Sequence, residues 1–131
     1  MAELTIPESH HDLLRASTVA LSTLNDDGTI QTTAVWVLLG DDGVVRMSLA
    51  KNRAKHHNLT ARPQATLFAI SPTNPFHVLE IRATVEFSPD ADLAFFTRAI
   101  AQYGQTPETM PEQAAEEREV VTFRPTRVRA A

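Results

Sequence analysis

Arg46–Leu59, with the sequence RMSLAKNRAKHHNL, joins a predicted strand to a predicted helix and gathers basic side chains at the junction. The β-branched and apolar residues of Val44–Leu49 favour a strand, and Asn52–Ala61 favours a short helix. Asn52 is expected to be the N-cap, because its side chain can accept a hydrogen bond from a free N–H group of the first turn. We expect the rest of the fold to be organised around this junction.

Three basic residues, Lys51, Arg53 and Lys55, lie at the predicted start of this helix. The helix macrodipole places partial positive charge at that end, so each cation there costs about 0.3–1 kcal/mol at low salt. The free N–H groups of a helix N-terminus already favour an anion. A bound phosphate or carboxylate would therefore explain the three cations, and solvated side chains that turn away from the helix start are the alternative.

The composition is typical of a globular domain and excludes several classes of function. The chain has 131 residues, 43% hydrophobic and 21% charged, which suits one domain with one core. Its net charge of −4 argues against a general nucleic-acid-binding protein, and the absence of cysteine excludes disulfides and thiolate metal sites. No apolar run approaches the roughly 18 residues that span a bilayer, and no signal peptide is recognisable. We expect a cytoplasmic protein without nucleic-acid or membrane partners.

The first strands are predicted around two tight turns. Ser17–Leu24 and Thr29–Leu39 are rich in β-branched residues, and they flank Asn25–Gly28, a turn in which glycine can take a positive φ angle. Gly40–Gly43 has the same turn chemistry and leads into Val44–Leu49. The pattern predicts an antiparallel meander of three strands.

Three further strands are predicted in the second half of the chain: Gln64–Ile70, His77–Phe87 and Glu119–Phe123. In His77–Phe87, apolar and polar residues alternate, as a half-buried antiparallel strand requires. Six antiparallel strands with short helices between them indicate a mainly β (α+β) fold. A small barrel would bury such strands and protect their edges.

Helices are predicted between the strands. Pro7–Ala16 has proline in the first turn and an apolar edge, which favours a short helix. A second helix is expected from Pro89 to Gly104, with Ser88 as its N-cap. The polar segment 106–118 is expected to contain one more short helix.

Other kinds of site have little support in the sequence. The adjacent pairs His10–His11 and His56–His57 would point about 100° apart on a helix, and neither has a partner at HExxH spacing, so no metal site is expected. No GxSxG, GxGxxG or Walker motif occurs. The strand that carries Trp36 mixes polar and apolar groups on both faces. Its outer face could line a pocket or a subunit interface, and an ordinary half-buried strand is the alternative.

The order of these segments resembles the pyridoxamine 5′-phosphate oxidase-like split β-barrel superfamily. The resemblance is carried by DDGTIQTTAVWV, RMSL, KNRAKHHNLTARPQATLFAI and VLEIRATVEF, and it is strongest over Asp27–Phe87. Within this superfamily the chain is most similar to the coenzyme F420-dependent (deazaflavin) oxidoreductases. The resemblance implies a six-stranded antiparallel split β-barrel of the FMN-binding type, with residues 1–131 as a single flavin- or deazaflavin-binding domain. It also implies a homodimer with two cofactors between its subunits.

The resemblance further implies a set of cofactor-binding residues: Thr32, Thr33, Ala34, Val35, Trp36, Met47, Ser48, Lys51, Arg53, Lys55 and Asn58. Arg53 and Lys55 would bind the cofactor phosphate, with Asn58 in support. Met47 and Ser48 would lie along the cofactor, and the residues of the second strand would face its ring system. No catalytic residue is implied, because hydride transfer is the chemistry of the cofactor.

Three functions are compatible with this reading. The first is an oxidoreductase that uses reduced coenzyme F420 to reduce a small unsaturated or carbonyl-containing substrate. The second is an FMN-dependent oxidoreductase of the same fold, and the third is a non-catalytic module that binds F420 or a flavin. Coenzyme F420 carries a longer anion than FMN, so the further basic residues His56, His57 and Arg62 favour the first.

Overall fold

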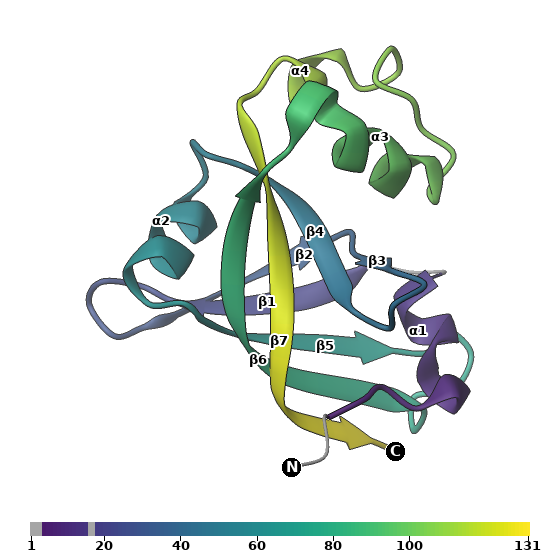
Figure 1. Ribbon diagram of the computed structural model, residues 1–131. Helices are drawn as coiled ribbons and strands as arrows, with labels where there is room; N and C mark the ends of the chain where they lie inside the picture. Colours follow the sequence, from purple (N-terminus) through teal and green to yellow (C-terminus); the bar gives the residue numbers. More distant parts are fainter. Residues whose placement is uncertain (1–3, 16–17) are drawn as a thin grey trace.

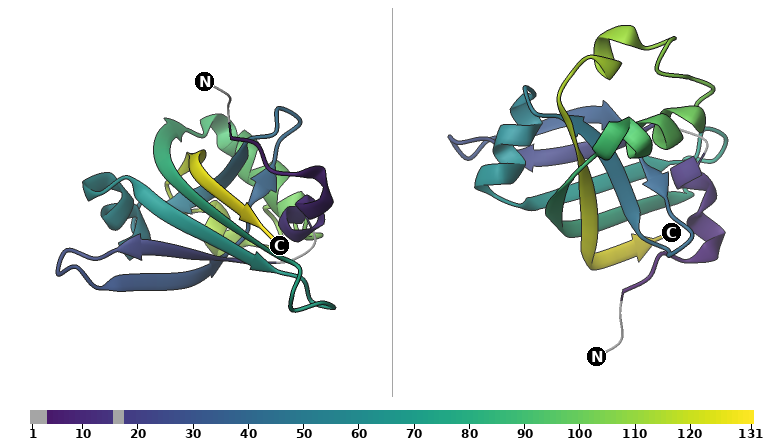
Figure 2. Two further views of the ribbon diagram at one scale, coloured as in Figure 1. Left: turned by 90° about the horizontal axis from the view of Figure 1, so that it is seen from below. Right: turned by 45° about the horizontal axis from the view of Figure 1, so that its top comes forward.

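The computed structural model describes residues 4–15 and 18–131, and its main feature is a seven-stranded antiparallel sheet (Figure 1). The strand order is β2-β1-β5-β6-β7-β4-β3. The strands are Val19–Leu24 (β1), Ile30–Val35 (β2), Leu38–Leu39 (β3), Val45–Ala50 (β4), Gln64–Ile70 (β5), Val78–Pro89 (β6) and Arg118–Ala130 (β7). The sheet is strongly curled in all three views (Figure 1 and Figure 2). The predicted mainly β fold of split-barrel type is confirmed.

The predicted strand Thr29–Leu39 is two strands in the structure, so the expected number of six becomes seven. β2 pairs with β1 and β3 pairs with β4, which makes two hairpins instead of the predicted meander. β2 and β3 form opposite edges of the sheet, yet only Trp36 and Val37 separate them along the chain. Three Cα–Cα steps span at most about 11 Å, so the two edges must approach each other and the sheet must curl.

Both predicted hairpin turns are present. Gly28 and Gly43 have φ angles of +86° and +78°, the left-handed conformation that glycine adopts without strain. The Asp27 carboxylate accepts a hydrogen bond from the N–H group of Thr29 at 3.0 Å, and Asp42 does the same for Val44 at 3.1 Å. The aspartates are therefore turn residues, as their sequence context predicts.

The apolar core fills the inside of the curled sheet. Side chains of β1, β5 and β6 alternate between buried and more exposed, as the sequence of His77–Phe87 predicts. Leu67 of β5 lies opposite Ile81 of β6, and both are buried with Val121 and Phe123 of β7.

The last strand is much longer than the predicted Glu119–Phe123. β7 pairs with β4 through its first half and with β6 along most of its length. Pro125 interrupts the apolar pattern, which is why the sequence predicts an earlier end. In the structure it lies opposite Ala83 beside a register shift, where a residue without an N–H group is tolerated.

The helices are short and lie between strands: Glu8–His10 (η1), Asp12–Arg15 (α1), Ala54–Ala61 (α2), Ala91–Leu93 (η2), Ala94–Ala101 (α3) and Pro111–Ala114 (α4). The predicted helix Pro7–Ala16 is thus divided in two, and residues 16 and 17 lie outside the described residues. In Figure 1, α3 and α4 form a lobe above the ends of β4 and β7, and α2 lies to one side of the barrel. In the part of the chain that the structure describes, no helix is long and apolar enough to cross a bilayer.

The predicted cap of α2 is wrong. The N-cap is Arg53 instead of Asn52, and no side chain caps the helix. The N–H group of Arg53 donates to the carbonyl oxygen of Ala50 at 3.3 Å, so a turn comes between β4 and the helix. The helix therefore starts at Ala54, which places Lys55 in its first turn and Lys51 outside it.

The predicted cap of the following helix is also wrong. Ser88 still belongs to β6, which pairs with β7 as far as Pro89. The acceptors at the start of α3 come from Asp90, whose carboxylate oxygens accept hydrogen bonds from the N–H groups of Phe95 (2.8 Å) and Phe96 (2.9 Å). Strand pairing keeps Ser88 extended, and this long-range effect is absent from local sequence.

Candidate functional site

A cavity of about 260 Å³ lies between the barrel and the lobe formed by α3 and α4. Much of its lining is apolar and includes Met110 and three residues of α3, namely Phe96, Ala99 and Ile100. Its polar lining residues are Thr18, Ser48, Arg53, Lys55, Gln113 and Arg118. The cavity therefore combines apolar surface with three cations.

Seven of the predicted site residues line this cavity: Ala34, Val35, Trp36, Met47, Ser48, Arg53 and Lys55. They come from the end of β2, from β4 and from the start of α2. β2 and β4 are not neighbours in the sheet, and the curl of the sheet brings them together. Contacts of these residues with a cofactor stay a prediction.

The other predicted site residues do not line the cavity: Thr32, Thr33, Lys51 and Asn58. Thr32 is on the exposed face of β2, where its hydroxyl group lies 3.0 Å from that of Ser22. Lys51 donates to Glu117 at 3.0 Å, outside the cavity wall.

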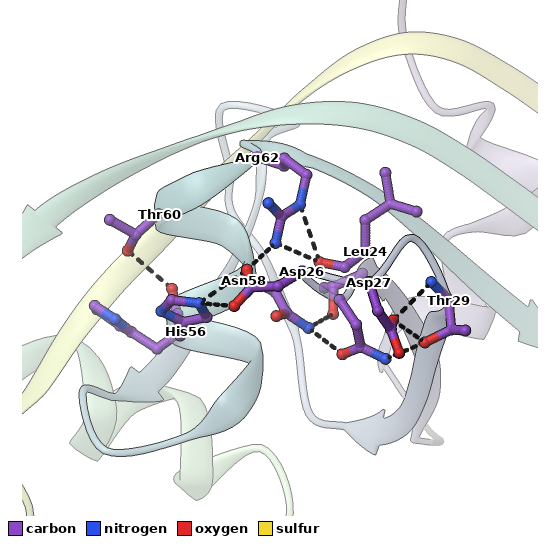
Figure 3. Close-up of polar contacts among 11 residues, drawn as sticks. Leu24, Asp26, Asp27, Thr29, His56, Asn58, Thr60 and Arg62 are labelled. Carbon is purple, nitrogen blue, oxygen red and sulfur yellow. Dashed lines mark hydrogen bonds and ion pairs between the residues drawn. The ribbon is translucent and has the colours of Figure 1, made fainter.

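Asn58 connects α2 to the β1–β2 hairpin (Figure 3). Asn58 is 3% exposed, and its side-chain amide donates to the hydroxyl oxygen of Thr23 at 3.1 Å and to the amide oxygen of Asn25 at 2.9 Å. A buried amide with these partners fixes the orientation of the helix. Asn58 thus acts on the basic residues at the start of α2 through the placement of the helix.

Asp26 adds a second connection between the hairpin and α2 (Figure 3). Its carboxylate accepts a hydrogen bond from Arg62 at 2.7 Å and lies 2.9 Å from Nε2 of His57. Hydrogen bonds from Arg62 and His57 lower the pKa of Asp26. These two basic residues, which the sequence places near a long anion, are therefore occupied by a carboxylate of this chain.

Two of the three cations predicted to share an anion have carboxylate partners within the chain. Lys51 pairs with Glu117 at 3.0 Å, and Arg53 pairs with Glu116 at 3.1 Å. The acids lie directly before β7, more than 60 residues away along the chain, so local sequence does not reveal these pairs. An external anion is not needed to balance Lys51.

Lys55 differs from its basic neighbours. In residues 4–15 and 18–131 its half-buried ammonium group makes no hydrogen bond or ion pair, although it lines the cavity. Burial lowers the pKa of Lys55, and the positive charges of Arg53 and Arg118 lower it further. A partly desolvated cation beside two like charges is stabilised by an anion. The wall around Lys55 is therefore the candidate anion site.

Arg118 is a cavity residue that the sequence does not single out. Its side chain is 11% exposed, its Nε donates to the hydroxyl oxygen of Ser48 at 2.7 Å, and its guanidinium carbon lies 4.6 Å from the ring centroid of Phe96. Burial lowers the pKa of Arg118. Arg118 lies at the start of β7 opposite Ala50 of β4, and this long-range strand pairing has no signal in the local sequence.

Trp36 and the link between β2 and β3 contact the residues that follow α3. Trp36 stacks on Tyr103 with ring centroids 4.3 Å apart and planes 6° apart. The amide of Gln102 donates to the carbonyl oxygen of Val37 at 3.1 Å, which fixes the link between β2 and β3. One face of the Trp36 ring is therefore covered by Tyr103, while the residue also lines the cavity.

The segment 106–118, whose role the sequence leaves open, contributes three residues to the cavity: Met110, Gln113 and Arg118. Among the described residues, no three histidine, aspartate or glutamate side chains are grouped as a metal site would require. The lining suits a ligand that joins a flat apolar part to an anionic part.

Known proteins share the fold of this chain along most of its length. The sequence profile of the family described as pyridoxamine 5′-phosphate oxidase matches residues 6–131. An F420 reductase of known structure is 32% identical, with a TM-score of 0.83 over 95% of this chain and 98% of the other. No curated protein sequence matches.

Two more distant structures share the fold. The Mycobacterium tuberculosis protein Rv2991 is 19% identical, with a TM-score of 0.76 over 99% of this chain and 87% of the other. The heme storage protein HutZ from Vibrio cholerae is 14% identical, with a TM-score of 0.70 over 97% and 95% of the two chains. At these identities the similarity establishes the fold alone.

Proposed function

This chain belongs to the pyridoxamine 5′-phosphate oxidase family, and on that premise we propose that it is a coenzyme F420-dependent oxidoreductase. In this proposal reduced coenzyme F420 donates a hydride to a small unsaturated or carbonyl-containing substrate. The observation that carries the proposal is the half-buried Lys55, which lines the cavity without an anionic partner in the described chain. The similarity to an F420 reductase supports the choice of cofactor.

The charges in the wall support an anionic ligand. Arg53, Lys55 and Arg118 are three cations in one wall, and Glu116 is the carboxylate that pairs with two of them. The formal charge of these four groups is +2, so the wall attracts the phosphate of a cofactor. Because coenzyme F420 also carries carboxylates on its oligoglutamate tail, we expect part of that tail to reach beyond the three cations.

The proposed task of the protein is to bind and orient the cofactor and to exclude water. The cationic wall would bind the phosphate, with Ser48 and Arg118 hydrogen-bonded to each other beside it. The apolar wall that includes Trp36 and Phe96 would accept the ring system and limit access of water. The cofactor supplies the hydride chemistry when it is bound.

We also propose that the working form is a homodimer. Several large apolar side chains are exposed on this chain, including Ile30 (67%), Phe68 (41%), Ile70 (46%) and Phe76 (84%). A second copy of the chain would bury them, and an interface of this kind would be expected to bury more than about 2,000 Å² in total. Light scattering at micromolar concentration tests the proposal, and a stable monomer would contradict it.

Titration of the cofactor-free protein with coenzyme F420 and with FMN tests the cofactor. We expect tighter binding of coenzyme F420, in line with the similarity to an F420 reductase, and a loss of its affinity with added salt, because salt screens the contacts with the cationic wall. Tighter binding of FMN, or a yellow FMN-loaded protein on purification, would favour the FMN-dependent oxidoreductase. Binding of reduced cofactor without turnover of any acceptor would favour a non-catalytic module.

A further inference from the structure

We propose that Glu116 is a positioning residue that orders Arg53 and Arg118 for binding of the cofactor anion. The proposal rests on the proposed function, because it concerns the same anion site. Nothing in the local sequence distinguishes Glu116 from its neighbour Glu117, since the two are adjacent glutamates before the last strand.

The carboxylate of Glu116 bridges the two arginines. Nη2 of Arg53 lies 3.1 Å from each of its oxygens, and Nη1 of Arg118 lies 3.3 Å from Oε1. The side chain of Glu116 is 17% exposed and does not line the cavity, whereas both arginines do. The acid therefore contacts the guanidinium groups without occupying the cavity itself.

These contacts leave donors available for a ligand. Arg118 uses Nε for Ser48 and shares Nη1 between Glu116 and the carbonyl oxygen of Gln113. Within the described residues, Nη2 of Arg118 and both Nε and Nη1 of Arg53 have no acceptor. Together with the ammonium group of Lys55, they form a set of unoccupied donors on residues of one wall.

Ordering these side chains before binding favours affinity. An arginine side chain has many rotamers, and an anion that has to immobilise two of them loses binding free energy. Each ion pair with Glu116 removes part of that freedom beforehand. The negative charge of Glu116 acts in the opposite direction, because it repels an incoming anion.

The two effects have opposite signs, so a substitution that removes the charge of Glu116 and keeps the size of its side chain separates them. If Glu116 acted only as a nearby negative charge, Glu116→Gln would tighten anion binding. If it positions the arginines, Glu116→Gln weakens binding although the wall becomes more positive. We expect coenzyme F420, and FMN if it binds, to bind about tenfold more weakly to Glu116→Gln than to the parent.

Glu117→Gln is the matched control. It removes the same charge one residue away, but its partner Lys51 does not line the cavity, and Glu117 is largely exposed. We expect the dissociation constant of this variant to change by less than about threefold, as is typical of exposed ion pairs. Dissociation constants are measured on the full-length chain by titration, together with thermal melting curves.

A double-mutant cycle tests whether Glu116 acts through Arg53. On the Arg53→Gln background, Glu116→Gln should weaken cofactor binding clearly less than it does in the parent. Glu116→Asp retains the charge with a shorter side chain, so it should recover part of the affinity. If Glu116→Gln does not fold, Glu116→Asp is used in its place. We then expect Glu116→Asp to bind the cofactor at least about threefold more weakly than the parent does.

The failures of the two proposals are distinguishable. A parent chain that binds neither coenzyme F420 nor FMN would contradict the proposed function. A parent that binds, together with a Glu116→Gln variant that binds equally or more tightly, would overturn the positioning role and leave the proposed function intact. Equal affinity of Glu116→Asp and the parent would overturn it in the same way when Glu116→Gln does not fold.

Discussion

Lys55→Met is expected to stabilise the free chain and to weaken its binding of cofactor. Methionine keeps an unbranched side chain of similar length and helix propensity, so packing of the stem and α2 itself are little changed. The ammonium group that it removes lies in the first turn of α2, where the macrodipole disfavours it, and beside the like charges of Arg53 and Arg118. We expect the free energy of unfolding to rise by about 0.3–1 kcal/mol at pH 7.

The loss in binding is expected to be larger. A hydrogen bond between a charged donor and an anion contributes about 1.5–3 kcal/mol, which corresponds to a dissociation constant about 10 to 150 times higher. Titration with coenzyme F420 measures the affinity, and urea unfolding measures the stability. Lys51→Met is the control, because Lys51 pairs with Glu117 outside the cavity wall. It should change affinity by less than about threefold and stability by less than about 1 kcal/mol.

The pH dependence gives a further check. The pKa of Lys55 is lowered in the folded chain, so the folded state binds its proton less tightly than the unfolded state does. The resulting penalty is present while Lys55 is charged in both states, and it is lost as the pH rises through the lowered pKa and past the ordinary value of 10.5. The stability gain of Lys55→Met should shrink over the same range. Unchanged cofactor affinity, or a loss of stability at pH 7, would refute the assignment of Lys55 to an anion site.

Other variants test neighbouring parts of the structure. Arg118→Gln should raise the dissociation constant for cofactor by about tenfold or more in the same titration, because a charge-assisted donor is lost from the wall. Asn58→Ala should lower the free energy of unfolding by about 1–3 kcal/mol in urea, because buried acceptors lose their donor. Asp26→Asn should lower the melting temperature at neutral pH, and the difference should shrink as the pH falls below 3.8, because hydrogen bonds lower the pKa of the native carboxyl group. Phe68→Glu should shift a dimer towards monomer in light scattering without unfolding the chain; an unchanged dimer would place the interface elsewhere.

Local sequence patterns predicted most of the strands. Gln64–Ile70 has the predicted bounds, and the alternation of His77–Phe87 appears as alternate burial in β6. These predictions succeed because side-chain period and turn chemistry are properties of adjacent residues. The turns of the β1–β2 and β3–β4 hairpins, which contain Gly28 and Gly43, were predicted for the same reason.

The errors in the predicted fold occur where distant pairing decides the conformation. β7 continues to Ala130 because β6 supplies a partner beyond Pro125, and Ser88 stays extended because it pairs with Val120. The break at Trp36 and Val37 exists because the strands on either side of it belong to opposite edges of the sheet. None of these long-range pairings can be read from a short window of residues.

The sequence by itself predicted a mainly β fold with basic residues at the junction of the strand Val44–Leu49 and the helix that follows it, because alternation and turn chemistry are local. Only the tertiary structure decided which of those cations face a cavity. The folded chain pairs Lys51 with Glu117, leaves Lys55 without a partner among the described residues, and brings Arg118 to its side. The physical reason is that electrostatic interactions depend on distances in space. Strand pairing between β4 and β7 makes residues more than 60 positions apart into neighbours.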